Sequence, residues 1–592
     1  MVTSEVRIIN GRPRLFIDNK PQIPCAYMTY FEERACYKDF ADIGYNLYSL
    51  CASFSGLPLN NGTGFAPHYG IFDVKGKPDY GRFDGYVKDI VQSCPDAKIF
   101  LRVWVSMPLW WIEEHPDEVC QSAGVLKREA LFSKSLRETG TDLLKQFISH
   151  IQESDYCDHI IGYQIAGGST EEWFHADANG SQSVCAKERF NAYLKHYYPD
   201  KYAQEVDIPD PSTYKVEGVI QNDLAQRYLE FVNYATADTV LHLAKVAKKC
   251  VNHSQIVGAF YGYVPEIANP LRGTMGLKKL LESPDIDFIC SPNSYFKNRA
   301  LGIDWAEHSL GESIKQRGKL YFLENDIRTF LSDYPNKCRP GCDPHNRYNT
   351  KVWLGPPTIE GSIWGMRKAF ARHYTHGNGL WWFDMWGGWY ANSELLEEAR
   401  HCRKLLSELH LTDMELTRSQ VAVLYDEKFP FRVGLKDKNA GVQEYIHNIF
   451  GNTGMTSDAL LSEDYEQSVN YEAVLIPFPE MFDTEETIKI KQYLTEKGIP
   501  FAQLSEEHYN ITPAQLREIL VNIGVHCYCD TDDVIYHGNG ILCIHSATAG
   551  HKTINLPKIC DITPLKSNIA PFTSNKIELE MNEFETQLFK IN

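Results

Sequence analysis

Three glutamates at the ends of apolar runs are the residues best suited to catalysis. Glu171 and Glu172 follow "HIIGYQIAGGST", and Glu324 lies near the end of "KLYFLEN". Two carboxylates on different elements can cleave a glycosidic bond, because one protonates the departing oxygen while the other attacks or stabilises the oxocarbenium-like centre. The plainer alternatives are a charge at a helix N-terminus for either adjacent glutamate and a structural ion pair with Arg328 for Glu324.

Further polar and aromatic residues lie at the ends of other apolar runs. Arg102 stands inside "FLRVWV", where a buried guanidinium needs a carboxylate partner, and we expect that partner in the site. Tyr295 ends another run, and "LWWFDMWGGWY" supplies Trp382, Asp384 and Trp386. Tryptophans stack on the face of a sugar, although the same stretch would also suit a protein core. We predict that these five residues contact the substrate.

Eight β-rich apolar runs, separated by helical segments, must position these side chains. Continuous rather than alternating apolar character is typical of parallel strands that are covered on both faces. Eight strand–helix units predict a (β/α)8 TIM barrel, in which the chemistry collects where the strands end. An open doubly wound sheet is the competing fold, but no Gly-rich phosphate loop follows any of the runs. The runs are 23–30, 46–54, 98–105, 159–166, 255–263, 286–295, 319–325 and 378–386.

The pattern divides the chain into three predicted domains. The barrel, preceded by a small hairpin in residues 1–20, occupies 1–412. Residues 413–524 restart an α/β pattern with strands at 419–427, 471–479 and 498–504 and an amphipathic helix between the last two. Residues 525–592 consist of short strands and turns, beginning with "GVHCYCD", and predict a small β-sandwich.

Composition narrows the classes of protein and partner. The formal net charge of −18 disfavours nucleic acid as a partner, because an acidic chain repels phosphate. The sequence contains no stretch of 18 apolar residues, so we predict no membrane span. The first residues show no secretory signal. The 16 scattered cysteines are therefore expected to be reduced thiols of a cytoplasmic protein. "CRPGCDPH" (338–345) does not have the spacing of a zinc site, so we expect a loop there and predict no metal and no cofactor.

Several of these segments resemble the clan A retaining glycosidases, most closely the family 42 β-galactosidases. The segments are "YKDFADIGYNLYSL" (37–50), "VWVSMPLWWIEEHPDEV" (103–119), "LYFLENDIRT" (320–329) and "HGNGLWWFDMWGGWY" (376–390). The resemblance implies a retaining exo-β-glycosidase acting on oligosaccharides or other glycosides, with Glu324 as the nucleophile. It also implies an α/β (flavodoxin-like) trimerisation domain at 413–524, and hence a homotrimer.

One motif departs from the clan's pattern. The fourth strand of the clan usually ends in Asn-Glu, whereas this chain reads "AGGSTEEW". This departure weakens an assignment to β-galactosides and fits relatives such as the trimeric family 164 β-mannosidases; an inactive sugar-binding protein on the same fold is the other alternative. Related segments keep the acid directly before the tryptophan, so we expect Glu172 to be the acid/base. Glu171 is then either a solvated neighbour or a like charge that raises the pKa of Glu172.

Overall fold

The computed structural model describes residues 2–59, 63–120, 128–176, 183–412, 414, 416–567 and 569–592. Its centre is a closed barrel of eight parallel strands, and each predicted apolar run contains one of them. Pairing of β6 with β7 closes the ring, so the TIM barrel is confirmed and the open sheet is not adopted. The strands are β4 (Cys25–Thr29), β5 (Leu47–Ser53), β6 (Lys98–Trp104), β7 (Ile160–Gly168), β9 (Ile256–Phe260), β10 (Phe288–Pro292), β11 (Leu320–Asn325) and β12 (Gly379–Asp384).

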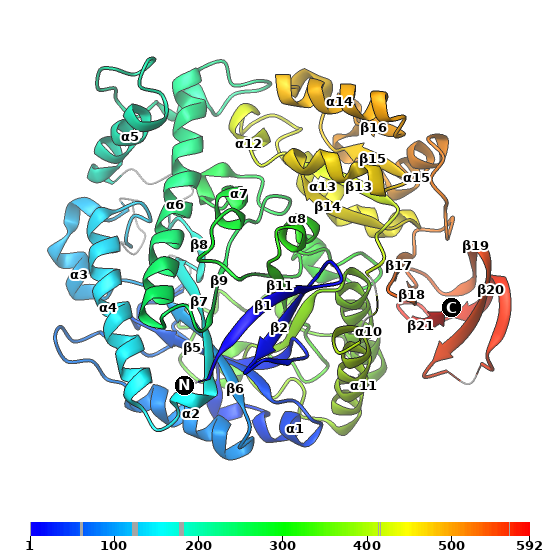
Figure 1. Cartoon of the computed structure of the whole chain (residues 1–592), viewed down its shortest axis with the longest axis horizontal. Coiled ribbons are helices and arrows are strands. Elements are labelled where there is room, and N and C mark those ends of the chain that lie inside the picture. Colours follow the sequence, from blue (N-terminus) through cyan, green and yellow to red (C-terminus); the bar gives the residue numbers. More distant parts are fainter. Residues whose placement is uncertain are drawn as a thin grey trace.

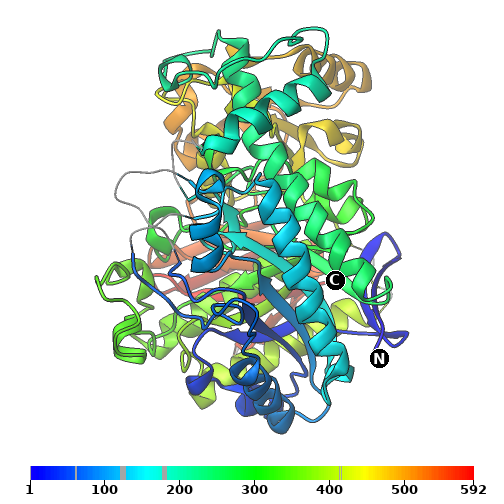
Figure 2. The same ribbon diagram turned by 90° about the vertical axis from the view of Figure 1, so that its left-hand side faces the viewer.

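Helices between the strands surround the barrel (Figure 1). Four of the long ones begin at side chains that accept a hydrogen bond from the first turn, namely Ser133, Asn222, Thr358 and Asn392. Both views show α4 and α6 side by side on the outside of the barrel (Figures 1 and 2). The helices that follow the eight strands are α1 (Tyr37–Asp42), α2 (Gly81–Ser93), α4 (Lys134–Glu153), α6 (Asp223–Cys250), α7 (Leu277–Leu281), α8 (Gly311–Gln316), α10 (Ile359–His376) and α11 (Ser393–His410).

Aromatic side chains fill the interior of the barrel below the site. The Phe100 ring lies 5.3 Å from Phe322 and 5.5 Å from Trp381, centroid to centroid. Side chains two residues apart on a strand share a face, so Arg102 lies above Phe100 on the same inner face of β6. Its guanidinium carbon is 4.5 Å from the centre of the Phe260 ring, and Arg102 is 1% exposed. The packed aromatics thus form a floor on which a buried cation rests.

The predicted N-terminal hairpin covers the other end of the barrel. Strands β1 (Ser4–Ile9) and β2 (Arg12–Ile17) pair antiparallel, and a short β3 (Lys20–Pro21) follows. The Ser4 hydroxyl accepts from the backbone N–H of Ile256 at 2.9 Å and donates to the carbonyl of Ile161. Because these are the first residues of two barrel strands, the hairpin lies at their amino ends, opposite the site.

Residues 419–522 form a second α/β unit. Its parallel sheet has the order β14-β13-β15-β16, formed by β13 (Val421–Tyr425), β14 (Ser457–Leu461), β15 (Ala473–Ile476) and β16 (Phe501–Gln503). The three predicted strands and the helix α14 (Glu485–Lys497) are present. Strand β14 was not predicted, because "SDALL" lacks a continuous apolar run.

The chain ends in the expected antiparallel β-sandwich. Its strands have the order β17-β18-β21-β19-β20, and the 16-residue β19 pairs with both β20 and β21. They are β17 (Val534–Gly538), β18 (Ile541–His545), β19 (Gly550–Leu565), β20 (Phe572–Met581) and β21 (Thr586–Ile591). Of the predicted short strands and turns, "GVHCYCD" contributes no strand: residues 525–530 form an irregular loop. We propose the division 1–412, 413–524 and 525–592, since both limits fall between elements.

Two other features bear on the sequence predictions. The short helix α9 (Pro335–Cys338) ends at the first residue of "CRPGCDPH". The rest of this segment consists of turns and bends, as expected of a loop. Among the described residues, no helix is long and apolar enough to cross a membrane.

Candidate active site

The two glycines before the adjacent glutamates let the chain fold back on its own strand. After β7 the backbone turns, and the N–H of Gly167 donates to the carbonyl of Glu171 at 3.1 Å. A Cβ on Gly167 would lie 2.6 Å from the Trp173 ring, and a Cβ on Gly168 would lie 2.6 Å from the carbonyl of Phe174. Neither position therefore admits a side chain.

Backbone strain in this turn separates the two glutamate side chains. Glu171 has a φ of +72° and Trp173 a φ of +61°, in the left-handed region that L-residues avoid. Trp173 is fully buried and donates from its indole nitrogen to the carbonyl of Ile165 at 3.1 Å. With Trp173 anchored, Glu171 makes contacts inside the barrel while Glu172 lines a cavity. Non-glycine residues held in this conformation cluster at functional sites.

Glu171 is a buried ion-pair partner. Its Oε2 accepts from Arg102 Nη1 at 3.0 Å and from the Tyr30 hydroxyl at 2.7 Å, and its Oε1 lies 2.7 Å from His68 Nε2. Burial alone would raise the pKa of Glu171, but His68 and Arg102 outweigh it and lower that pKa to about 2. The prediction of a solvated neighbour is wrong, since Glu171 is 1% exposed. The other alternative agrees with the structure, because its charge helps to raise the pKa of Glu172.

Glu172 begins the short strand β8 (Glu172–Phe174) and faces the cavity. Its Oε1 accepts a hydrogen bond from the Tyr263 hydroxyl at 3.1 Å. Burial raises the pKa of Glu172 to about 8, and the nearby charge of Glu324 acts in the same direction. Glu172 therefore holds its proton near neutral pH, as a general acid must.

Glu324 reaches the same cavity from β11, and Arg102 connects it to Glu171. Arg102 donates from Nη2 to Glu324 Oε2, from Nη1 to Glu171 and from Nη1 to Tyr30 at 2.8 Å. Burial raises the pKa of Glu324 to about 7, while Arg102 opposes the shift. Arg102 therefore has the expected carboxylate partner in the site, and it has two of them, Glu171 and Glu324. Arg102 pairs directly with Glu324, which favours the ionised form of Glu324.

The cavity above these groups has a volume of about 340 Å³ and a wall rich in aromatic rings. This volume lies in the lower part of the range for small-molecule sites. Trp353 and Tyr348 contact one another with ring centroids 5.2 Å apart. The lining residues are Tyr30, Leu59, Phe65, Arg102, Thr170, Glu172, Phe174, Phe260, Ile267, Arg272, Tyr295, Glu324, Tyr348, Trp353 and Met385. Carboxyl groups, two arginines and flat apolar rings therefore converge on one cavity.

Of the predicted substrate-contacting residues, Arg102 and Tyr295 line the cavity. The Tyr295 hydroxyl donates to Asp326 Oδ2 at 2.7 Å, which fixes the ring in the wall. Trp386 does not line the cavity; it is fully buried and packs behind the wall, 5.1 Å from the Trp353 ring. Its predicted contact with substrate is therefore corrected to a supporting position.

Trp382 and Asp384 also lie outside the cavity. Trp382 is fully buried and donates from its indole nitrogen to the Tyr45 hydroxyl at 2.8 Å. Asp384 accepts from the Tyr27 hydroxyl at 2.7 Å and from the backbone N–H groups of Gly388 and Trp389 at 2.8 and 2.9 Å. Both side chains point outward from β12, and we correct their predicted role from substrate contact to structural support.

Several site residues were not predicted. Tyr30 and Tyr263 end the runs 23–30 and 255–263, so a search for every polar side chain at a strand end would have found them. His68 lies in a loop and Trp353 ends the short 3-10 helix η7 (Lys351–Trp353). Both are far from the active-site glutamates in sequence, and no local pattern marks them. Their positions follow from the closure of the barrel and from long-range packing.

Comparison with known proteins shows the fold. No family model and no curated protein sequence matches this chain. Among solved structures, it is similar to the cold-adapted β-galactosidase from Rahnella sp. R3, with 12% identity and a TM-score of 0.60, covering 96% of this chain and 98% of that one. It is also similar to Gan42B, a GH42 β-galactosidase from G. stearothermophilus, with 12% identity and a TM-score of 0.61, covering 96% of this chain and 98% of that one. The exo-carrageenase GH42 from Bacteroides ovatus has 11% identity and a TM-score of 0.58, and the match covers 99% of this chain and 85% of that one. The chain therefore has the fold of the GH42 β-galactosidases.

Proposed function

We propose that this chain is a retaining, exo-acting β-glycosidase. The observation that carries the proposal is that Glu172 and Glu324 line one cavity and differ in their tendency to hold a proton. Pairs of carboxyls with separated pKa values mark an acid and its partner. The GH42 fold and the aromatic wall support a sugar as the ligand. The small volume of the cavity supports removal of a single terminal residue.

In the proposed mechanism, each residue has a defined part. Glu324 attacks the anomeric carbon while Glu172 gives its proton to the departing glycosidic oxygen, leaving a covalent glycosyl-enzyme. Glu172, now ionised, takes a proton from water, which attacks the same carbon and releases Glu324. Arg102 orients Glu324, and Tyr263 holds Glu172. These two carboxyls provide the chemistry without a cofactor.

Hydrolysis of a panel of nitrophenyl glycosides tests the proposal and ranks the sugars. We expect β-D-galactoside to be the best substrate, with β-D-mannoside as the alternative glycone. The departure at "AGGSTEEW" and the exo-carrageenase among the similar structures are the reasons for testing a wide panel. Turnover that is abolished in Glu324→Gln would reject the inactive sugar-binding alternative. No turnover of any glycoside, together with binding of free sugars, would support that alternative.

The pH dependence should report the two cavity carboxyls. Activity requires Glu324 ionised and Glu172 protonated, so kcat/KM should rise as pH passes about 7 and fall as it passes about 8. Facing carboxyls titrate as a pair, so the two limbs belong to both groups together. A kcat/KM–pH profile on an aryl glycoside measures them. In Glu172→Ala, assayed on an activated dinitrophenyl glycoside, the alkaline limb should disappear.

A retaining mechanism also fixes the stereochemistry of the product. The carboxyl groups of Glu172 and Glu324 should lie about 5–5.5 Å apart, whereas about 6.5–9.5 Å would leave room for water and give inversion. Proton NMR of the reaction in progress should therefore show the β-anomer of the free sugar first. The α-anomer as first product would mean inversion.

We propose that residues 413–524 mediate assembly into a homotrimer. The residues that line the cavity all precede this segment, so its function lies elsewhere. Closed cyclic assemblies are the usual form of soluble homo-oligomers. Light scattering at micromolar concentration should give three times the chain mass of 67.7 kDa. A monomer mass would contradict this prediction. Apart from Cys120, the cysteines are free thiols, which fits the proposed cytoplasmic location.

A further inference from the structure

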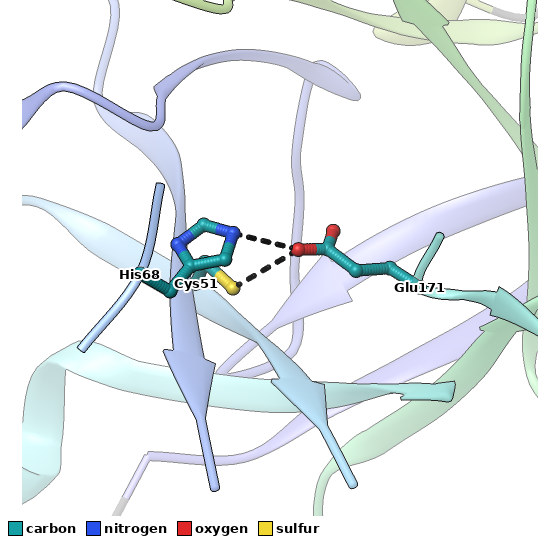
Figure 3. Close-up of side chains that lie close together, drawn as sticks. All are labelled: Cys51, His68 and Glu171. Carbon is teal, nitrogen blue, oxygen red and sulfur yellow. Dashed lines mark hydrogen bonds and ion pairs between the residues drawn. The ribbon is translucent and has the colours of Figure 1, made fainter. Parts of the chain in front are cut away.

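Glu171 also belongs to a group of three potential metal ligands, together with Cys51 and His68 (Figure 3). Cys51 comes from β5, His68 from the segment that follows this strand, and Glu171 from the turn after β7. Their ligand atoms all lie within 4.8 Å of one another, and no other group of three in the described part of the chain meets this criterion. The three residues are far apart in sequence, which is why the sequence predicted no metal.

The ligand types and their spacing suit zinc. Thiolate sulfur, imidazole nitrogen and carboxylate oxygen are the three donors that Zn²⁺ takes in proteins, with Zn–S of about 2.3 Å and Zn–N or Zn–O of about 2.0 Å. Tetrahedral bonds of those lengths place sulfur and oxygen about 3.5 Å apart, and Cys51 Sγ lies 3.6 Å from Glu171 Oε1. Tetrahedral bonds of about 2.0 Å place nitrogen and oxygen about 3.3 Å apart. His68 Nε2 lies 2.7 Å from the same oxygen, so these two atoms would separate by about 0.6 Å on binding.

The charge of the surrounding groups also favours a dication. Arg102 is buried between the carboxylates of Glu171 and Glu324, a set that carries one net negative charge when both are ionised. A zinc ion with the thiolate of Cys51 adds one positive charge and makes the buried set neutral. Uncompensated buried charge is costly, so a neutral set is stable.

A second cavity gives access from outside. It has a volume of about 300 Å³ and is lined by Cys51 and His68 together with the acidic side chains of Glu32, Asp73 and Asp79. Neither Glu172 nor Glu324 lines it, so an ion entering from this side would not meet the reacting carboxyls. Lys77 and Arg82 line it as well, and burial raises the pKa of Glu32 to about 8, so the cavity offers an ion a route without a strong net charge.

We propose that Cys51, His68 and Glu171 bind a zinc ion whose fourth position opens to this second cavity. The ion binds Glu171 Oε1, while Oε2 remains with Arg102 and Tyr30. It thereby fixes the carboxylate that positions Arg102, and through Arg102 the orientation of Glu324. The site stands independently of the proposed glycosidase activity, because metal content is measured without any substrate.

Metal analysis of the purified full-length chain tests the site. After equilibration with Zn²⁺ and removal of excess ion, the wild type should retain about one zinc per chain, and Cys51→Ser and His68→Gln should each retain less than a tenth of that. Cys290→Ser is the matched control: Cys290 is a fully buried thiol on another barrel strand and belongs to no such ligand group in the described part of the chain. Its zinc content should equal that of the wild type.

Cobalt substitution gives a second readout that does not depend on how well the variants fold. Co²⁺ added to the wild type should produce a thiolate-to-cobalt charge-transfer band and the intense visible absorption of a four-coordinate site, both removed by a chelator. Absence of these bands, or a wild type without zinc after equilibration, would overturn the proposal and leave the three side chains joined by hydrogen bonds alone. Bands or zinc that persist in a folded Cys51→Ser protein would overturn it as well.

Discussion

Glu324→Gln is expected to lower kcat/KM for aryl glycosides by about 10⁴-fold or more, because the variant lacks the atom that attacks the anomeric carbon. The change preserves shape, and Arg102 keeps its partner in Glu171, so the protein should remain folded. The loss should be found with good and poor leaving groups alike, since attack by Glu324 and departure of the leaving group belong to one step. Steady-state kinetics on phenyl and dinitrophenyl glycosides measure both effects.

Another buried glutamate provides the control for Glu324→Gln. Glu427 is 2% exposed, and burial raises its pKa to about 7, as it does for Glu324, but it lies at the end of β13, away from the cavity. Glu427→Gln should therefore retain activity. Azide added to Glu324→Gly should restore turnover of an activated β-glycoside and give the α-glycosyl azide. A Glu324→Gln enzyme that keeps most of its activity would contradict the assignment of the nucleophile.

Glu172→Ala should lose about 10²–10⁴-fold on substrates with poor leaving groups. The loss should be much smaller on dinitrophenyl glycosides, which depart without a proton. In the second step the variant lacks its base, and azide can replace water without one, so azide should raise turnover and yield the β-glycosyl azide. Product analysis and the ratio of kcat/KM between the two classes of substrate provide the measurement.

Glu171→Gln should differ from Glu172→Ala in kind. It removes a charge from buried partners, so the free energy of unfolding should fall, as His68 and Arg102 lose an ionised partner. Activity should fall by the same factor for good and poor leaving groups, and azide should give no rescue. The reverse pattern in the two variants would make Glu171 the acid/base.

Much of the barrel could be predicted because each buried parallel strand needs a continuous apolar run. That same continuity hid which face of a strand points inward. On β12, Trp381 packs against Phe100 and Phe322 inside the barrel, while Trp382 contacts Tyr45 outside it. An apolar run covered on both faces carries no alternation, so sequence alone could not set the phase of Trp382 and Asp384.

The adjacent glutamates show a different limit. Alternation along a regular strand places two neighbours on opposite faces, but "STEEW" is no regular strand: Glu171 and Trp173 both have positive φ. The two glycines indicated a tight turn. The direction of that turn could not be predicted, because it depends on the burial of Trp173 and on the ion pair between Glu171 and Arg102. Arg102 itself was predictable, because a guanidinium on an apolar strand requires carboxylate partners.

The central claim, a covalent intermediate on Glu324, is tested most directly by trapping it. A 2-deoxy-2-fluoro glycoside of the best sugar with a dinitrophenolate leaving group slows the second step more than the first, so the glycosyl-enzyme accumulates. Peptide mass mapping should then show one fluoroglycosyl group per chain, attached to Glu324. A label on Glu171, Glu172 or another residue, or rapid turnover with inversion and no label, would contradict the account.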